Sequence, residues 1–290
     1  MGRKNHRGQL FAGIIDSDPG RIREKGLKTI PESPIPNRDS TIPRIHSFLA
    51  PGQKCVILEQ PPPSMKPLPI CFPDRASAGR QLAEKLEPYR NRHPLILALP
   101  RGGVVVGYQV ALALESPLEV LVIRKIGAPG HRELAVGAIA PGGIRIFDPE
   151  ALFILGISSE DLAERVKEEE MEMDRRQRLY RQGAALPDFT DRTVILIDDG
   201  MDTGLTALAA VRCARKGGAG KIILAVPVGS PETVRKLREE TDAVVCLFQP
   251  DPFQAVGQWY DSFEPTPDAE VLYLLERQRR QLNARSGKEP

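Results

Sequence analysis

The sequence of 290 residues has few of the features that mark secreted or membrane-inserted proteins. It contains only four cysteines, none in a C-x-x-C arrangement, so we expect neither a disulfide framework nor a zinc site. Cys213 and Cys246 lie in apolar patterns and are expected to be buried thiols. No stretch approaches the ~20 apolar residues that span a bilayer, and the start lacks an apolar signal core. These absences predict a protein of the reducing cytoplasm, without a membrane partner.

A strong charge of one sign is also missing. Forty basic and 38 acidic residues leave a net charge of +2, which argues against a general nucleic-acid binder. Hydrophobic residues at 41% and charged residues at 27% are ordinary for a globular protein. The length allows one large domain or two small ones.

Residues 1–70 differ from the remainder of the chain. They are rich in proline, carry scattered Arg and Lys, and show no sustained hydrophobic period. Such a segment buries too little surface to offset its ordering entropy, so we predict a disordered, basic extension, with a basic arm that docks a partner as the alternative. Met65 is a second candidate for the native start. The interpretation divides the chain into this extension, an ordered domain at 71–276 and a basic tail at 277–290.

The ordered region alternates short apolar runs with helical patterns. This alternation predicts an α/β fold with a doubly wound, mostly parallel sheet, plus a small hood region outside it. Strands are expected at 95–99, 119–124, 135–140, 144–147, 193–198, 221–226 and 243–248. A first helix is expected after Asp74 as its N-cap, with Ala78, Leu82, Ala83 and Leu86 on one face, and further helices are expected at 104–114, 159–182, 205–216, 231–240 and 268–281. The charges of the helix at 159–182 are interpreted as a solvated face.

The most informative segment runs from Val194 to Thr206. It begins with four apolar residues, which predict a buried strand, and Asp198 and Asp199 follow directly. A turn rich in Gly and Thr comes next and precedes a helix. Ligands of open α/β sheets bind beyond the carboxyl ends of the strands. A loop that opens a helix offers free N–H groups and a positive dipole end to a phosphate. Carboxylates for sugar hydroxyls beside a phosphate cradle predict a site for a sugar phosphate.

Two further loops follow strands. Pro100-Arg101-Gly102-Gly103 combines a bidentate cation with glycines that allow close approach of a ligand to the main chain. The segment 124–134 begins with Arg124-Lys125, and its Gly-Ala-Pro-Gly core is expected to prevent regular structure. Such a loop is typical of an active-site lid, the alternative being an exposed hairpin with ordinary surface cations.

The run from Val194 to Thr206 resembles the phosphoribosyl-pyrophosphate (PRPP) motif of the type I phosphoribosyltransferases. The pattern departs from the family only at Gly200, where an apolar residue is usual. The wider likeness, from about Phe72 to Glu276, is to a broad group of bacterial phosphoribosyltransferase-like proteins. The resemblance implies phosphoribosyl transfer from PRPP to an unidentified acceptor, expected to be a nitrogenous base, with release of pyrophosphate.

The resemblance also assigns roles to residues. Asp198 and Asp199 would bind the ribose hydroxyls, directly or through Mg²⁺, and Asp202, Thr203, Gly204, Leu205 and Thr206 would bind the 5-phosphate. In the family the Arg101 loop binds pyrophosphate, often with a cis peptide bond, and the segment at 124–134 is a flexible flap. Pyrophosphate would therefore contact Arg101, Gly102, Gly103, Arg124 and Lys125. The expected catalytic residues are Asp198, Asp199, Lys125 and Arg101.

The acceptor pocket is expected in the hood, where Phe253, Trp259 and Tyr260 would stack on a flat base. The alternative is that these rings pack the edge of the domain. Two other functions stay open: a non-catalytic regulatory protein that binds PRPP or a nucleotide, and a hydrolase of a phosphorylated sugar or nucleotide. No G-x-S-x-G elbow supports a separate hydrolytic centre. A homodimer is expected.

Overall fold

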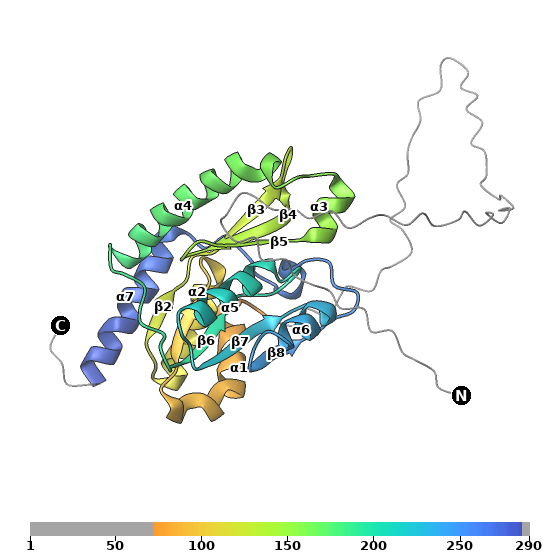
Figure 1. The fold of residues 1–290 in the computed structure, drawn as a ribbon. Coiled ribbons are helices and arrows are strands. Elements are labelled where there is room, and N and C mark those ends of the chain that lie inside the picture. Colours follow the sequence, from red (N-terminus) through yellow and green to blue (C-terminus); the bar gives the residue numbers. More distant parts are fainter. Residues whose placement is uncertain (1–71, 286–290) are drawn as a thin grey trace, which may run out of the picture. The chain divides into compact units, whose positions relative to one another are not determined.

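The computed structural model describes residues 72–285 (Figure 1). The predictions for residues 1–70, for Met65 as the native start, and for residues 286–290 lie outside the described residues. The helices are α1 (Arg75–Leu86), α2 (Gly102–Leu114), α3 (Pro149–Leu155), α4 (Ala163–Arg181), α5 (Leu205–Lys216), α6 (Pro231–Arg238) and α7 (Asp268–Arg285). Short 3-10 helices occur at Glu87–Arg92, Glu160–Leu162 and Val256–Trp259.

A parallel five-stranded sheet forms the centre of the fold, in the order β2-β1-β6-β7-β8. Its strands are β2 (Leu118–Val120), β1 (Leu95–Ala98), β6 (Thr193–Ile197), β7 (Lys221–Val228) and β8 (Ala243–Phe248). Four of them match runs that the sequence predicted as strands, whereas β2 ends at Val120 and overlaps only the start of the strand predicted at 119–124. The predicted α/β class with a doubly wound parallel sheet is confirmed. The pairing aligns Ala98 with Ile197, so the chain leaves β1 and β6 at the same level.

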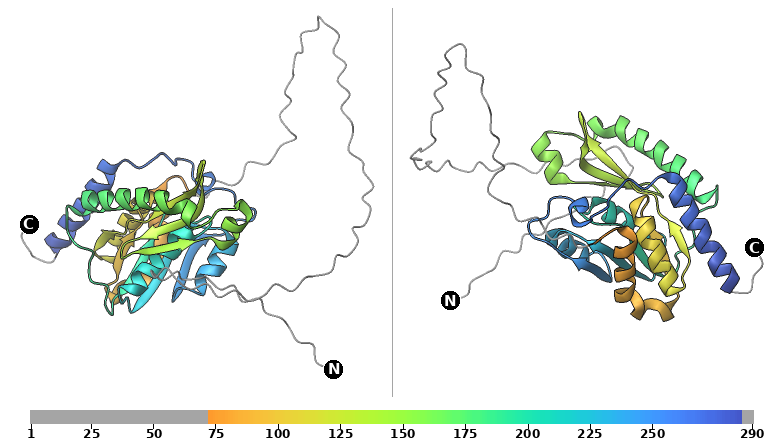
Figure 2. Two further views of the ribbon diagram at one scale, coloured as in Figure 1. Left: turned by 45° about the horizontal axis from the view of Figure 1, so that its top comes forward. Right: turned by 180° about the vertical axis from the view of Figure 1, so that it is seen from behind.

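Helices cover both faces of this sheet. Successive strand residues point to opposite sides, so an apolar strand has two faces to bury. Ile96, Ala98, Ile195 and Ile197 belong to one buried cluster, which includes α1, α2 and α7. The intervening residues of β1 and β6 belong to a second cluster, which includes α5 and α6. Viewed from behind, α1 and α2 lie side by side on their face of the sheet (Figure 2). Fully apolar strands are therefore what this architecture requires.

A second, antiparallel sheet has the order β3-β4-β5, formed by β3 (Arg124–Ala128), β4 (His131–Ala140) and β5 (Ile144–Phe147). The expectation that residues 124–134 lack regular structure is wrong. They form a hairpin that turns at Pro129-Gly130, and Gly130 adopts a φ of 75°, which glycine tolerates. Gly127 sits at a register shift of the pair, where an added Cβ would meet the backbone of Arg132. The glycines thus shape the hairpin instead of preventing it.

Several helices differ from their predicted bounds. Asp74 caps α1 by accepting a hydrogen bond from the Ser77 N–H at 2.6 Å, as predicted. Helix α3 was not predicted, and the predicted helix at 159–182 begins with a 3-10 turn before α4. Helix α7 continues to Arg285, past its predicted end at residue 281, so part of the expected basic tail is helical. There, Gln278 is buried and donates to the Ser116 carbonyl.

Among residues 72–285, no helix combines the length and the apolar content that crossing a membrane requires.

Candidate functional site

The two glycine-containing loops meet at the carboxyl edge of the core sheet. The Leu99 N–H donates to the Ile197 carbonyl at 2.8 Å, which joins the chain directly before each loop. The Pro100–Arg101 peptide is cis, as in the family that the sequence resembles. A Cβ on Gly103 would lie 2.8 Å from the Ile197 carbonyl oxygen and 2.9 Å from Asp198 Cα. Glycine is therefore the residue that allows the Arg101 loop to pack against the Asp-Asp motif.

The two adjacent carboxylates have different surroundings. Asp198 Oδ1 accepts a hydrogen bond from the Asp199 N–H at 2.9 Å. Burial raises the pKa of Asp198 most, and the neighbouring charge of Asp199 raises this pKa further. Asp199 Oδ2 instead forms an ion pair with Arg75 Nε at 2.7 Å. Arg75 was not among the predicted site residues. It precedes the core strands in the sequence, and only the packing of α1 brings it to the motif.

Four hydrogen bonds fix the loop that follows the acids, one of them from the Ser230 N–H to the Met201 carbonyl at 3.0 Å. The Tyr260 hydroxyl donates to the Asp199 carbonyl at 2.6 Å, and the Met201 N–H donates to the Val228 carbonyl at 2.9 Å. The Thr233 hydroxyl donates to the Asp202 carbonyl at 2.5 Å. The loop is thus held through its carbonyl groups and one N–H, which leaves its other N–H groups available.

The N–H groups of residues 202–207 make no hydrogen bond to any residue that the structure describes. Gly204 precedes α5 with a φ of 79°, and no side chain caps this helix. A loop of this shape with uncapped N–H groups binds anions, because the partial positive charges of the N–H groups converge on one point. Asp202 and Thr203 are exposed, whereas Thr206 Oγ1 is buried without a partner among residues 72–285. The residues predicted to bind the 5-phosphate therefore lie together.

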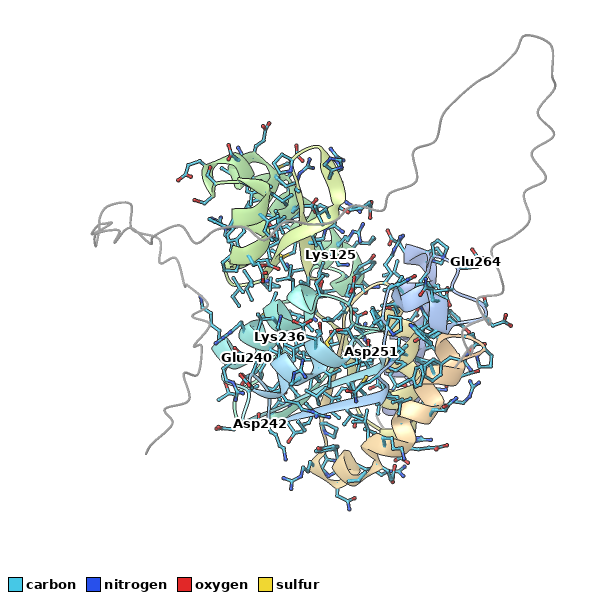
Figure 3. All side chains as sticks on the ribbon, turned by 90° about the vertical axis from the view of Figure 1, so that its right-hand side faces the viewer. Lys125, Lys236, Glu240, Asp242, Asp251 and Glu264 are labelled. Carbon is cyan, nitrogen blue, oxygen red and sulfur yellow. The ribbon has the colours of Figure 1, made fainter. Side chains whose placement is uncertain are left out.

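The hairpin brings one of its two leading cations to the acids. Arg124 and Lys125 are neighbours on β3, so they point to opposite faces of the strand. The Lys125 charge acts to lower the pKa of Asp198, against the larger opposite effects of burial and Asp199. Figure 3 shows Lys125 where the three-stranded sheet faces the rest of the domain. Lys125 therefore lies near enough for its charge to act on Asp198, and its contact with pyrophosphate stays a prediction.

Arg124 points to α4 instead. Its Nη2 is 2.7 Å from Glu169 Oε2, and Arg145 on β5 pairs in the same way with Glu170. The pyrophosphate contact expected for Arg124 disagrees with this geometry, because its charge is already engaged. The interpretation of the α4 charges as a solvated face is wrong for these two glutamates, which attach the hairpin sheet to the helix.

Arg101 stands at the edge of the site with 39% of its side chain exposed. Its nearest acidic partner is Asp268, the first residue of α7, at 3.8 Å. Asp268 also accepts a hydrogen bond of 2.6 Å from Tyr180, and burial together with this bond raises the pKa of Tyr180 to about 12. The long Arg101–Asp268 separation leaves the guanidinium free to turn toward an anion.

The aromatic residues predicted to hold the acceptor do not form an open pocket. Trp259 and Tyr260 are 2% and 5% exposed and belong to a buried cluster with Phe72, and the partly buried Phe253 packs against it. A base cannot stack on rings whose faces contact protein, so the stacking role is wrong in this conformation for Trp259 and Tyr260. Tyr260 acts instead through its hydroxyl on the Asp199 carbonyl.

Gly200 marks the one departure from the expected motif, and the structure gives its reason. A Cβ at this position would meet the Cγ1 of Val256 and, at 2.8 Å, its Cγ2. Val256, from the segment after β8, therefore occupies the space that the usual apolar side chain of the motif would need.

Magnesium was expected at the acids. No group of three or more His, Cys, Asp or Glu side chains within the described residues could hold a metal ion without other ligands. Mg²⁺ is commonly bound through one or two carboxylates plus substrate phosphates and water, so the donor set of this loop fits that ion together with a phosphorylated ligand. A cation at this point would favour the ionised form of Asp198.

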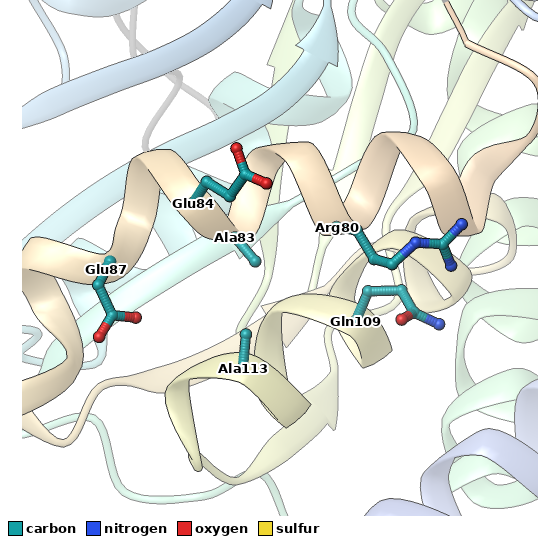
Figure 4. A pocket seen from close by; sticks show the side chains of 6 residues that line it. All are labelled: Arg80, Ala83, Glu84, Glu87, Gln109 and Ala113. Carbon is teal, nitrogen blue, oxygen red and sulfur yellow. The ribbon is translucent and has the colours of Figure 1, made fainter.

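A separate hollow of about 380 Å³ lies between α1 and α2 (Figure 4). Its walls carry Arg80, Glu84, Glu87 and Gln109 around the methyl groups of Ala83 and Ala113. None of the predicted site residues lines it, so it is distinct from the strand-end site.

Comparison with known proteins identifies the family. Residues 73–258 match the family model for the phosphoribosyl transferase domain. The chain belongs to this family. The phosphoribosyl transferase domain includes both strand-end loops and the hairpin, so the fold and the recognition made from the sequence are confirmed.

Two curated relatives from strains of Mycobacterium tuberculosis are named only as candidate phosphoribosyl transferases. Each is 42% identical over 211 residues, which cover 72% of this chain and 47% of the relative. This chain therefore spans about half the length of those relatives. The crystal structure of the protein TT1426 from Thermus thermophilus is 37% identical with a TM-score of 0.60, and the match covers 71% of this chain and 98% of that one.

Proposed function

We propose that this protein transfers a phosphoribosyl group from PRPP to a small acceptor, expected to be a nitrogenous base, and releases pyrophosphate. One observation carries the proposal. The N–H groups of residues 202–207 lie in the loop after Asp198 and Asp199 and in the first turn of α5, and none of them has a partner among residues 72–285. A phosphorylated pentose satisfies both features, because its phosphate accepts from the N–H groups while its hydroxyls donate to carboxylates.

The surrounding residues supply what this reaction needs. The transition state resembles a sugar cation with weak bonds to both partners, so the protein must position the two and stabilise charge between them. The carboxylates would favour the positive ring, and Lys125 and Arg101 would stabilise the leaving pyrophosphate. Mg²⁺, held through Asp198 or Asp199 with substrate oxygens, would neutralise part of the pyrophosphate charge. A helix terminus contributes only about 0.3–1 kcal/mol to an exposed anion, so the hydrogen bonds and cations must supply most of the affinity.

A non-catalytic protein that binds PRPP or a nucleotide is the second candidate. Two observations favour it. Asp199 is already engaged by Arg75, and the rings expected to hold an acceptor are buried. The position of Lys125 beside Asp198 favours catalysis, because binding the sugar phosphate alone does not require a cation from the hairpin.

Isothermal calorimetry with PRPP and Mg²⁺ tests the site. The wild type is expected to bind, and the double variant Asp198→Asn, Asp199→Asn is expected to lose binding. Asp174→Asn is the matched control, because Asp174 is an exposed acid on α4. Equal binding by the double variant and the wild type would refute the site.

Release of pyrophosphate separates the two candidates. With PRPP, Mg²⁺ and a panel of purine and pyrimidine bases, an enzyme releases pyrophosphate in the presence of at least one base. A protein that binds PRPP but releases none with any base of the panel is assigned to the regulatory class. A cytoplasmic location and a homodimer stay predictions from the sequence, since no observation on this chain tests them.

A further inference from the structure

We propose that Arg75 is the resident counterion of Asp199, so that Asp199 is a positioning residue and Asp198 is the acid left to ligate a metal ion. The two adjacent acids would then have different roles. This proposal deepens the proposed function, but its decisive measurements need no PRPP, so they can succeed or fail independently of the proposed function.

Three contacts from two separate parts of the chain hold Arg75 in place. Its Nε is 2.7 Å from Asp199 Oδ2, its Nη1 donates to the Glu264 carbonyl at 2.8 Å, and its guanidinium lies 3.7 Å from the centre of the Phe263 ring. The Arg75 and Asp199 side chains are 11% and 17% exposed. A guanidinium that is stacked, hydrogen-bonded and largely removed from water is pre-organised for its ion pair, unlike a mobile surface cation.

The oxygen that Arg75 contacts has no room for a metal ion. Gly102 packs against the same atom, because a Cβ there would meet Asp199 Oδ2 and would lie 2.6 Å from Arg75 Nε. Mg²⁺ requires a near-octahedral shell of oxygens at about 2.1 Å, and it keeps several waters. Such a shell cannot form at Oδ2 while the Arg75 guanidinium occupies one of its positions.

Asp198 has the opposite surroundings. One of its oxygens accepts the Asp199 N–H, and no cation of the described residues lies within ion-pair distance of it. Lys125 is near enough to act on its charge but forms no ion pair with it. Asp198 is therefore the member of the pair that lacks a fixed counterion, and a metal ion arriving with an anionic ligand would supply one.

Mn²⁺ is a suitable probe, because it prefers the same hard oxygen ligands and its free fraction is measured directly by electron paramagnetic resonance. In the full-length protein without PRPP, Asp198→Asn is expected to remove the weak Mn²⁺ binding of the wild type, whereas Asp199→Asn leaves it within threefold. Arg75→Gln is expected to bind Mn²⁺ at least tenfold more tightly, because both carboxylates become available. The added change Asp199→Asn is expected to abolish that gain.

Two further variants separate this role from a structural one. Arg75→Lys keeps the positive charge and should bind Mn²⁺ within threefold of the wild type. Arg80 is a second cation of α1, further along the helix, and it contacts Ser77. Arg80→Gln should therefore leave Mn²⁺ binding unchanged. Thermal unfolding of each variant checks that it folds. If Arg75→Gln does not fold, the comparison of Asp198→Asn with Asp199→Asn in the wild type decides the question.

The proposal is overturned if Asp199→Asn weakens Mn²⁺ binding by the wild type as much as Asp198→Asn does. It is also overturned if folded Arg75→Gln binds Mn²⁺ no more tightly than the wild type. Absence of PRPP binding by the wild type would instead count against the proposed function and leave these metal measurements decisive for Arg75.

Discussion

Substitution of Gly103 by alanine tests whether the Arg101 loop and the Asp-Asp motif act as one unit. The added Cβ would lie 2.8 Å from the Ile197 carbonyl oxygen and 2.9 Å from Asp198 Cα. Carbon atoms in good contact are about 3.5–4.0 Å apart, so one of the two loops must move by roughly 0.6 Å or more. Both neighbours are backbone atoms, which cannot rotate away as a side chain would.

The expected cost has two parts. Overpacking destabilises by about 1–3 kcal/mol, and alanine in a helix returns at most about 1 kcal/mol. A misplacement near 1 Å in a catalytic arrangement costs about a hundredfold, so the smaller shift here should weaken PRPP binding by roughly 10- to 100-fold, or about 1.4–2.8 kcal/mol. Calorimetry gives the affinity, and urea unfolding gives the stability.

Gly107→Ala is the matched control on the same helix. Its Cβ would lie 3.0 Å from the Ala98 Cβ and 3.3 Å from Leu118 Cδ1, so the strain falls on the core face of β1 and β2. Gly107→Ala is expected to lower stability without changing the affinity for PRPP. The reasoning is refuted if Gly103→Ala binds PRPP as tightly as Gly107→Ala does.

Four other substitutions extend these tests. Gly200→Val should destabilise by about 1–3 kcal/mol through contact with Val256, and the added change Val256→Ala should restore most of that in urea unfolding; no recovery would contradict the packing. Tyr180→Phe removes a group whose pKa of about 12 exceeds its ordinary value of 10, so the native state holds the phenolic proton more tightly than the unfolded chain does. The stabilisation from this proton is complete below pH 10 and is lost between pH 10 and about 12. The variant should therefore lose less stability than the wild type across this range, and an unchanged slope of unfolding free energy against pH would contradict the role of Tyr180. Glu169→Gln should cost about 1 kcal/mol or less and speed hydrogen exchange in β3 and β4, whereas unchanged exchange would show that the Arg124 pair does not hold the hairpin. Lys125→Ala should weaken PRPP binding about tenfold or more while Lys167→Ala, on the exposed side of α4, does not; equal effects would remove Lys125 from the site.

The core strands could be predicted from sequence because their pattern is local. Val194–Ile197 and Leu95–Leu97 are apolar on both faces, as a central parallel strand must be. The loops after them were also predictable, since Asp198-Asp199 and Arg101-Gly102-Gly103 stand directly after their strands. Parallel strands place their carboxyl ends at one edge, which brings the two loops together before any side-chain contact is known.

The hairpin at 124–134 was harder to predict for a physical reason. Gly127, Pro129 and Gly130 have low strand propensity, so the local signal indicates a loop. The tertiary structure overrides that signal, because β5 extends the sheet and α4 binds it through Glu169 and Glu170. The same packing directs Arg124 to α4 and Lys125 toward the acids, a difference that cannot be predicted from two adjacent basic residues.

The sequence by itself determined the core strands and the helices between them, the two acids at a strand end and the turn rich in Gly and Thr after them, because each depends on residues that are close along the chain. Only the tertiary structure decided which groups surround those acids. Arg75 and Tyr260 reach the motif from α1 and from the segment beyond β8, Phe263 packs against Arg75, and Trp259 is buried instead of facing a ligand. Contacts between residues far apart in sequence leave no periodic trace in the chain, so the charge balance of the site is established only by folding.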